Sequence, residues 1–261
     1  MITITIDPVI LSIGHFQLRW YGLIVLLAVM IGLWLVIREA QRKGFSKESI
    51  QDLAIWVIIG GLIGARLFHV IDHWEDVFSK EPGRILAFWE GGLAIWGAIA
   101  GGLIPLVIFA WRKHWNLARL LDAFAPGVVL GQAIGRIACI ITGDSIGKPT
   151  GGPFGLAYTH PDAMVSQLGI YYAPTPIYEI LLNSAIFIIL WRLRRLRLPD
   201  GALFLIYLGL YSTGRFLITF MNNYREFAFG LNQAQVVSLV GLVVALPLLV
   251  HMLILNKQIK G

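Results

Sequence analysis

Seven long apolar stretches constrain what this chain can fold into. A helix that crosses about 30 Å of hydrocarbon needs about 20 predominantly apolar residues. Runs of roughly this length occur at 20–37, 52–73, 88–110, 120–142, 175–191, 201–221 and 233–255. A soluble helical bundle does not carry seven such runs. The sequence therefore predicts an all-α integral membrane protein with about seven transmembrane helices.

Composition agrees with this class. Hydrophobic residues make up 57% of the chain and charged residues 14%, whereas soluble domains carry about 25% charged residues. The single cysteine, Cys139, excludes an internal disulfide. No basic segment precedes the first apolar run, so we expect no cleaved signal peptide. We predict one polytopic domain over 1–261, with a long external loop at about 143–175.

Lysine and arginine predict the orientation, because they concentrate in cytoplasmic loops. The basic connections REAQRKGFSKE, WRKHWNLAR and WRLRRLR alternate along the chain with connections that hold few basic residues. Seven spans with this alternation place the N-terminus outside and the C-terminus in the cytoplasm. The net charge of +6 then reflects membrane topology, and a role in DNA binding receives little weight.

Three arginines lie inside predicted spans. Arg66, Arg136 and Arg215 each stand six or seven residues from the outer end of a span, which corresponds to a depth of roughly 10 Å. One such arginine could snorkel to the interface. Three at one depth on three helices favour an inward-facing cluster instead. Small residues precede each one, in GGLIGAR, GQAIGR and STGR, and allow close helix packing.

Acidic and phenolic residues share this outer half. Glu90 opens the third span, Asp144 closes the fourth, Glu179 begins the fifth, and Tyr211 lies one turn from Arg215. Some of these carboxylates could simply neutralise the arginines. Guanidinium groups also bind phosphate in a bidentate manner. We therefore expect an outward-facing pocket that holds an anionic group, which a lipid headgroup fits better than a soluble ion.

Six motifs, in order, resemble the prolipoprotein diacylglyceryl transferase family. They are DPVILSIGHFQLRWYGL, GARLFHV, WEGGLAIWGAIAGG, GRIACIITGDSIGKPT, PTPIYEILL and YSTGRFLITF, and together they span nearly the whole chain. The resemblance implies an enzyme of the bacterial plasma membrane with its active site toward the outer leaflet. Such enzymes move the diacylglyceryl group of phosphatidylglycerol onto the lipobox cysteine of a prolipoprotein, with glycerol phosphate as the other product. No metal or other cofactor is implied.

The resemblance also implies site residues. Arg136 matches the arginine of the G-R signature and Arg215 that of the Y-x-x-x-R segment, and we assign both to a phosphate clamp. Arg66 matches a third arginine, which could complete the clamp or form a structural ion pair. It further implies Tyr21 for lipid binding, and Asp144 and Tyr211 for catalysis beside the two clamp arginines. Glu179 is added to the lipid-binding candidates from its position alone.

This sequence departs from the family pattern where a proton acceptor is expected. Trp96 stands where many members have a histidine, to which a general-base role has been attached, and Thr219 replaces an acidic residue. Asp144 and His69 are the other candidates for the base, and neither is decisive. Cys139 replaces a signature asparagine, so we interpret it as a packed thiol rather than a nucleophile.

Two alternatives stay open. A transporter of an anionic solute would also need buried cations, although such proteins often have internal repeats and a site near the midplane, and neither feature is evident here. A catalytically impaired homologue that still binds phosphatidylglycerol would explain Trp96. The loop at 143–175, rich in glycine, proline and aromatic residues, is expected to help receive the prolipoprotein.

Overall fold

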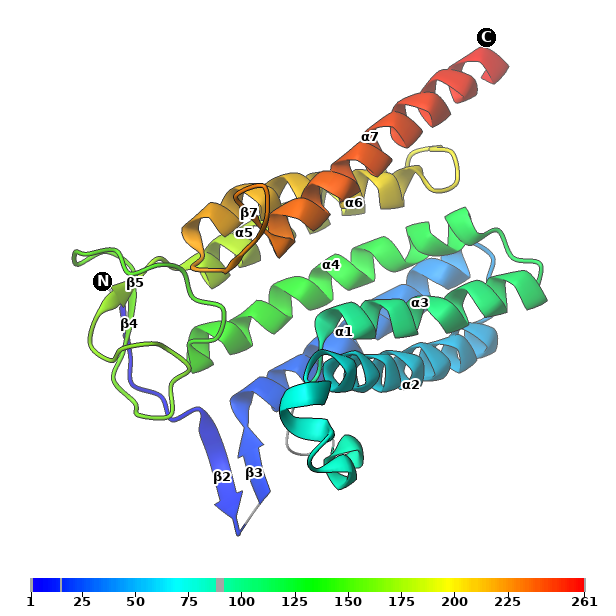
Figure 1. Ribbon diagram of the computed structural model, residues 1–261. Coiled ribbons are helices and arrows are strands. Elements are labelled where there is room, and N and C mark those ends of the chain that lie inside the picture. The colour runs from blue at the N-terminus through cyan, green and yellow to red at the C-terminus, as the bar shows by residue number, and fades with distance from the viewer. Residues whose placement is uncertain (1, 15, 88–91, 261) are drawn as a thin grey trace. The chain divides into compact units, whose positions relative to one another are not determined.

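Seven helices dominate the computed structural model, which describes residues 2–14, 16–87 and 92–260 (Figure 1). Within these ranges, seven helices are long and apolar enough to cross a membrane. They are α1 (Trp20–Arg42), α2 (Lys47–Asp72), α3 (Ile95–Arg112), α4 (Leu117–Thr142), α5 (Thr175–Leu193), α6 (Ala202–Ile218) and α7 (Gln233–Lys260). The prediction of an all-α membrane protein with seven spans is confirmed. Its orientation stays a prediction.

The helices begin and end within a few residues of the predicted spans, with one exception. The third span was expected from residue 88, but α3 begins at Ile95. Gly92 has a φ of +70° and Ala94 is extended, so the backbone directly before Ile95 cannot be helical. Glu90, which we expected to open this span, lies outside the described residues.

The chain divides into two compact units. The first unit contains residues 1–36 and 121–261, and the second contains residues 37–120. In the second unit, α2 and α3 pack backbone against backbone. An ideal Cβ on Gly64 would lie 2.9 Å from the Cα of Gly101. Because only glycine permits this approach, Gly64 and Gly101 set the α2–α3 spacing.

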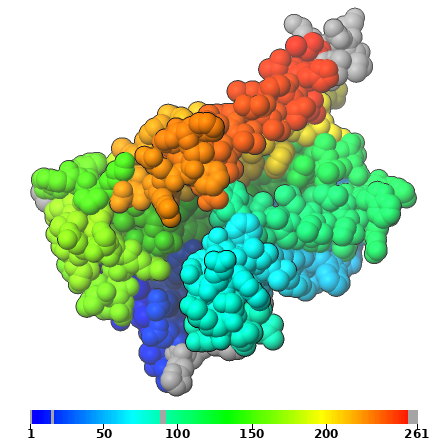
Figure 2. All heavy atoms as spheres, viewed as in Figure 1, coloured from blue at the N-terminus to red at the C-terminus, as the bar shows by residue number. Residues whose placement is uncertain are grey.

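In the first unit, α4, α5 and α6 enclose one apolar core. Its buried members are Ala125, Val129, Ile186, Leu190, Leu203 and Tyr207. Helix α7, drawn in orange to red in Figures 1 and 2, packs along α6, drawn in yellow in Figure 1. Much of α7 nevertheless leaves apolar side chains exposed, including Val240, Val243 and Leu246. That is expected of a surface that faces lipid rather than water.

Short strands gather at one end of the first unit, which we call the strand end. Strand β1 (Ile2–Ile4) pairs in parallel with β4 (Leu156–Tyr158), and β4 pairs with β5 (Tyr171–Tyr172). Two hairpins, β2–β3 (Val9–Ile13 and Phe16–Arg19) and β6–β7 (Glu226–Ala228 and Leu231–Asn232), complete the set. The segment at 143–175 is therefore a folded connection, with strands too short for the hydrophobic pattern to indicate.

Tyr158 anchors this connection to α4. Its hydroxyl donates to the carbonyl of Ile140 at 2.8 Å. Burial raises the pKa of Tyr158 above its ordinary value, because the phenolate would lose its hydration. The hydroxyl therefore keeps its proton and continues to donate throughout the physiological pH range.

At the opposite end of the first unit, Asp122 ties α4 to α6. Its Oδ2 accepts from the backbone N–H of Gly201 at 3.0 Å, and its Oδ1 accepts from that of Phe204 at 2.9 Å. The first N–H groups of a helix have no partner within the helix. A buried carboxylate from α4 thus caps α6.

Replacing Asp122 should destabilise the protein. We expect Asp122→Ala to lower the free energy of unfolding by about 1–2 kcal/mol, because two N–H groups at the start of α6 lose their acceptor. Thermal unfolding of the purified protein in detergent measures the change. The control is Asp52→Ala, which removes an exposed aspartate from α2. Equal unfolding temperatures for the two variants would contradict the capping role.

Candidate functional site

One carboxylate joins two arginines near the strand end of the first unit. Glu179, whose side chain is 2% exposed, places Oε2 2.6 Å from Nε of Arg136. Its Oε1 accepts from Nη1 of Arg215. The prediction that arginines on different helices converge is confirmed for Arg136 and Arg215. Because two guanidinium groups share one carboxylate, the cluster keeps one net positive charge.

Helix geometry explains why these three residues meet. Arg136 lies six residues before the end of α4, Arg215 three before the end of α6, and Glu179 four after the start of α5. At 1.5 Å per residue, each lies within about 10 Å of its helix end. The core that joins α4, α5 and α6 fixes their spacing.

The two guanidinium groups are not fully enclosed. Side-chain exposure is 21% for Arg136 and 15% for Arg215. Nη1 of Arg136 donates to Sγ of Cys139 at 3.6 Å, and Nη2 of Arg215 donates to the hydroxyl of Tyr224 at 3.4 Å. Thiol and phenol are weak neutral acceptors, so an anion could displace either one without leaving a charge unpaired.

A layer of aromatic and amide groups lies one helical turn further from the strand end. The rings of Tyr211 and Tyr207 stack with centroids 5.8 Å apart. The hydroxyl of Tyr207 donates to Oε1 of Gln132 at 3.1 Å. Within this layer Tyr211 lies one helical turn from Arg215, and its place in the site stays a prediction.

Tyr21 and Asp144 lie at the edge of the cluster. Tyr21, on α1, is within electrostatic reach of Arg136, Cys139 and Asp144. Asp144 follows α4 directly, and its backbone N–H donates to Oγ1 of Thr142 at 3.4 Å. No described cation lies within ion-pair distance of the Asp144 carboxylate. Asp144 thus forms no ion pair with the described arginines.

Arg66 belongs to the second unit and is buried there. Its Nε donates to the carbonyl of Ile85 at 3.0 Å, Nη1 to that of Gly92 at 3.3 Å, and Nη2 to that of Arg84. These three bonds hold the connection between α2 and α3. They show a structural role for Arg66 through carbonyl groups, whereas the sequence left open a structural ion pair; its place in a phosphate clamp stays a prediction.

The other candidates for the proton acceptor also belong to the second unit. His69 packs between aromatic rings, with its centroid 4.3 Å from that of His73 and 5.9 Å from that of Phe78. Trp96 is the second residue of α3 and is half-buried. An indole cannot accept a proton, so Trp96 cannot replace the histidine found in many family members.

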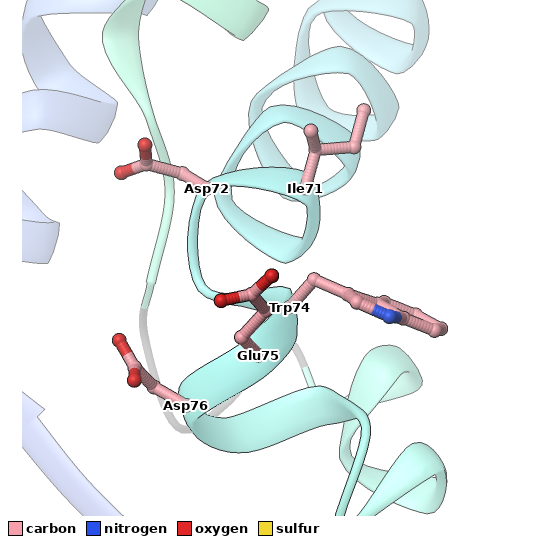
Figure 3. A pocket seen from close by; sticks show the side chains of 5 residues that line it. All are labelled: Ile71, Asp72, Trp74, Glu75 and Asp76. Carbon is pink, nitrogen blue, oxygen red and sulfur yellow. The ribbon is translucent and has the colours of Figure 1, made fainter.

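Two clusters of polar side chains lie outside the site described above. Asp7, His160 and Asp162 bring ligand-type atoms within 4.8 Å of one another among the described residues, although both aspartates are exposed. A shallow hollow in the second unit is lined by Ile71, Asp72, Trp74, Glu75 and Asp76 (Figure 3). All five side chains are exposed. Neither group contains a residue that the sequence pointed to.

Sequence reasoning missed Tyr224 and Gln132. Tyr224 lies nine residues after Arg215, in a connection without a recognisable pattern. Gln132 stands in GQAIGR, where its neutral side chain drew no attention beside Arg136. A search for polar residues one turn from each membrane arginine would have found Gln132, four residues before Arg136.

Seven apolar helices with a charged cluster among three of them define a multi-pass membrane protein with a polar centre. A family model described as prolipoprotein diacylglyceryl transferase matches residues 8–251. The chain belongs to this family, which is a family of membrane transferases.

Curated relatives support the assignment over nearly the full length. A phosphatidylglycerol–prolipoprotein diacylglyceryl transferase of Dehalococcoides mccartyi is 41% identical over 264 residues, which cover 99% of this chain and 98% of the relative. An enzyme of the same name from Listeria welshimeri is 36% identical over 249 residues, covering 94% and 90%. Together with the seven helices, these bacterial relatives indicate a multi-pass bacterial membrane protein.

Removing the shared carboxylate should destabilise the first unit. We expect Glu179→Gln to lower the free energy of unfolding by about 3 kcal/mol, because two adjacent guanidinium groups lose their counter-charge. Thermal unfolding in detergent measures the loss. Glu75→Gln, which alters an exposed carboxylate, is the control and should change little. If both variants unfold at the same temperature, Glu179 does not hold the cluster together.

Proposed function

We propose that this protein transfers the diacylglyceryl group of phosphatidylglycerol to the lipobox cysteine of prolipoproteins, at the outer face of the bacterial plasma membrane. The observation that carries the proposal is the Arg136–Glu179–Arg215 cluster, in which two arginines share one buried carboxylate. Family membership supports it, since the relatives are named for this reaction.

The cluster suits a lipid phosphate. Phosphate presents several oxygens in a geometry that guanidinium forks match. One positive charge remains after Glu179 is counted, and Cys139 and Tyr224 are neutral partners that a phosphate could displace. With the strand end outside, as the basic loops predict, the arginines lie near the level of outer-leaflet headgroups.

The reaction is a direct displacement, in which the protein stabilises the developing charge and forms no covalent intermediate. The acceptor thiolate attacks the diacylglyceryl carbon that carries the phosphate ester, a carbon–sulfur bond forms, and the carbon–oxygen bond breaks. The electron pair of that bond leaves on glycerol phosphate. Arg136 and Arg215 would stabilise this developing charge. They would also favour the thiolate form of an acceptor cysteine nearby.

The other site residues take supporting roles in this proposal. Glu179 positions the two guanidinium groups, since a carboxylate would repel the phosphate itself. Tyr211 and Tyr21 contribute hydroxyl groups beside the clamp. Asp144, which has no described ion-pair partner, is the group in the first unit best placed to accept the thiol proton. The connection at 143–175, folded by β4 and β5, would receive the acceptor.

One observation favours a second candidate. Trp96 occupies the position of the family's histidine, and an indole accepts no proton. If that histidine is indispensable, the protein binds phosphatidylglycerol without transferring its diacylglyceryl group. Transfer to a lipobox peptide distinguishes the two functions directly, because only the transferase produces a thioether.

Arg136→Lys should abolish most activity while the protein still inserts and folds. Lysine keeps the charge but loses the planar fork, so we expect transfer from phosphatidylglycerol to a lipobox peptide to fall about 100-fold or more. Mass spectrometry of the peptide measures the product. The matched control is Arg225→Lys at an exposed arginine, which should keep its activity. Normal transfer by Arg136→Lys would remove Arg136 from the clamp.

Trp96→Phe should retain transfer within about threefold of the unaltered protein. Neither ring accepts a proton, so a base elsewhere is unaffected by the exchange. The same peptide assay measures the rate, and thermal unfolding checks that the variant folds. A rate that rises only in Trp96→His would show that a base at this position still matters.

A further inference from the structure

A small polar cavity lies beyond the end of α6, at the strand end of the first unit. Its volume is about 130 Å³, enough for several water molecules. The lining is formed by Lys148, Thr219, Phe220, Asn222, Tyr224, Glu226, Gly230, Asn232 and Gln235. The cavity is partly open to the surface, and its size admits a short alcohol.

Asn222 is the unusual member of this lining. Its side chain is buried, and Nδ2 donates to the carbonyl of Ser145 at 3.3 Å. Its Oδ1 receives no hydrogen bond from any residue that the structure describes. Buried amide oxygens nearly always have a partner. Less than 1 Å² of this oxygen is accessible, so a ligand hydroxyl that enters the cavity would reach it after a small rotation of the side chain.

The backbone fixes Asn222 next to Lys148. Gly147 and Asn222 form an isolated antiparallel bridge, and the N–H of Lys148 donates to the carbonyl of Met221 at 2.7 Å. A Cβ on Gly147 would lie 2.8 Å from the same carbonyl oxygen. This close approach therefore requires glycine at 147, and it brings a cation and an acceptor to one wall.

Hydrogen-bond donors complete the lining of the cavity. Asn232 and Gln235 use their side-chain oxygens to accept each other's backbone N–H groups, both at 3.0 Å. Their amide NH₂ groups therefore remain as donors on the side chains that line the cavity. Hydroxyl groups both donate and accept hydrogen bonds, so a lining with both kinds of partner suits an alcohol with several hydroxyl groups.

Tyr224 connects the cavity to the charged cluster. It lines the cavity, and its hydroxyl accepts from Nη2 of Arg215 at 3.4 Å. The guanidinium of Arg215 also lies 5.8 Å from the centre of the Tyr224 ring. A phosphate held by Arg215 would therefore place its second ester substituent beside the cavity, on the side away from the membrane interior.

We propose that this cavity binds the headgroup glycerol of the donor lipid, with Oδ1 of Asn222 accepting from a glycerol hydroxyl. The inference rests on the proposed function and deepens it. The cavity selects glycerol-headed phospholipids over others, and it holds glycerol phosphate as that product leaves. Asn222 is a specificity-determining residue in this account, and it takes no part in bond making or breaking.

The test compares two donors with identical acyl chains. Phosphatidylglycerol and phosphatidylpropanol differ only in the hydroxyl groups of the headgroup. We expect Asn222→Leu to lower the ratio of their transfer rates to a lipobox peptide about tenfold, mainly by slowing transfer from phosphatidylglycerol. The ratio is independent of how much of the variant folds. The matched control, Asn223→Leu, alters the neighbouring exposed asparagine and should leave the ratio unchanged.

A second measurement needs no variant. Glycerol phosphate should inhibit the unaltered protein at about tenfold lower concentration than propyl phosphate does. If Asn222→Leu folds and the ratio of transfer rates from the two donor lipids is unchanged, the inference is overturned. If that variant does not fold, equal inhibition by glycerol phosphate and propyl phosphate overturns it. Transfer without headgroup preference would leave the proposed function standing. Absence of transfer from every donor would overturn the proposed function and the inference with it.

Discussion

The ionic contact between Glu179 and two arginines is the interaction on which the organisation of the first unit depends. Charges inside a membrane protein are tolerated when they are paired, and one carboxylate here serves two guanidinium groups from two other helices. Full neutralisation would need a second acid, and among the described residues Asp144 lies at the edge of the cluster without forming an ion pair with either arginine. The cluster therefore combines structural cohesion with a residual positive charge, which a structural ion pair alone would not leave.

The rest of the unit holds that cluster in place from both ends. Asp122 caps α6 from α4 at one end, and the strands and Tyr158 secure the connection after α4 at the other. The apolar core between them sets the spacing of α4, α5 and α6. Arg66 repeats the principle in the second unit, where one guanidinium gathers three carbonyls of the connection between α2 and α3. A buried carboxylate thus organises the first unit, and a buried arginine organises the second.

The helices could be predicted because length and hydropathy determine them almost alone, and Arg136 and Arg215 stood out because charge is rare in such runs. The contact that pairs these arginines with Glu179 could not be predicted in the same way. Glu179 was recognised as a candidate, but its contact with both arginines depends on the rotation of three helices, which hydropathy does not encode. Asn222 escaped notice because its contacts join connections far apart in the sequence. Tyr224 escaped notice because nothing in its connection indicates that the chain turns back toward Arg215. The start of α3 was misplaced because Gly92 interrupts a run that is apolar apart from Glu90.

The pairing of β1 with β4 has a consequence for biosynthesis. Ile2–Ile4 is synthesised well before its partner strand, Leu156–Tyr158, which follows more than 150 residues later. At about 5–20 residues per second, the first strand waits roughly 10–30 s for its partner. Four helices must enter the membrane in that interval while the leading segment stays unpaired. The pairing of β1 with β4 can therefore form only after α1–α4 have been synthesised, and a bulky group attached next to Ile2 would interfere with this pairing rather than with insertion.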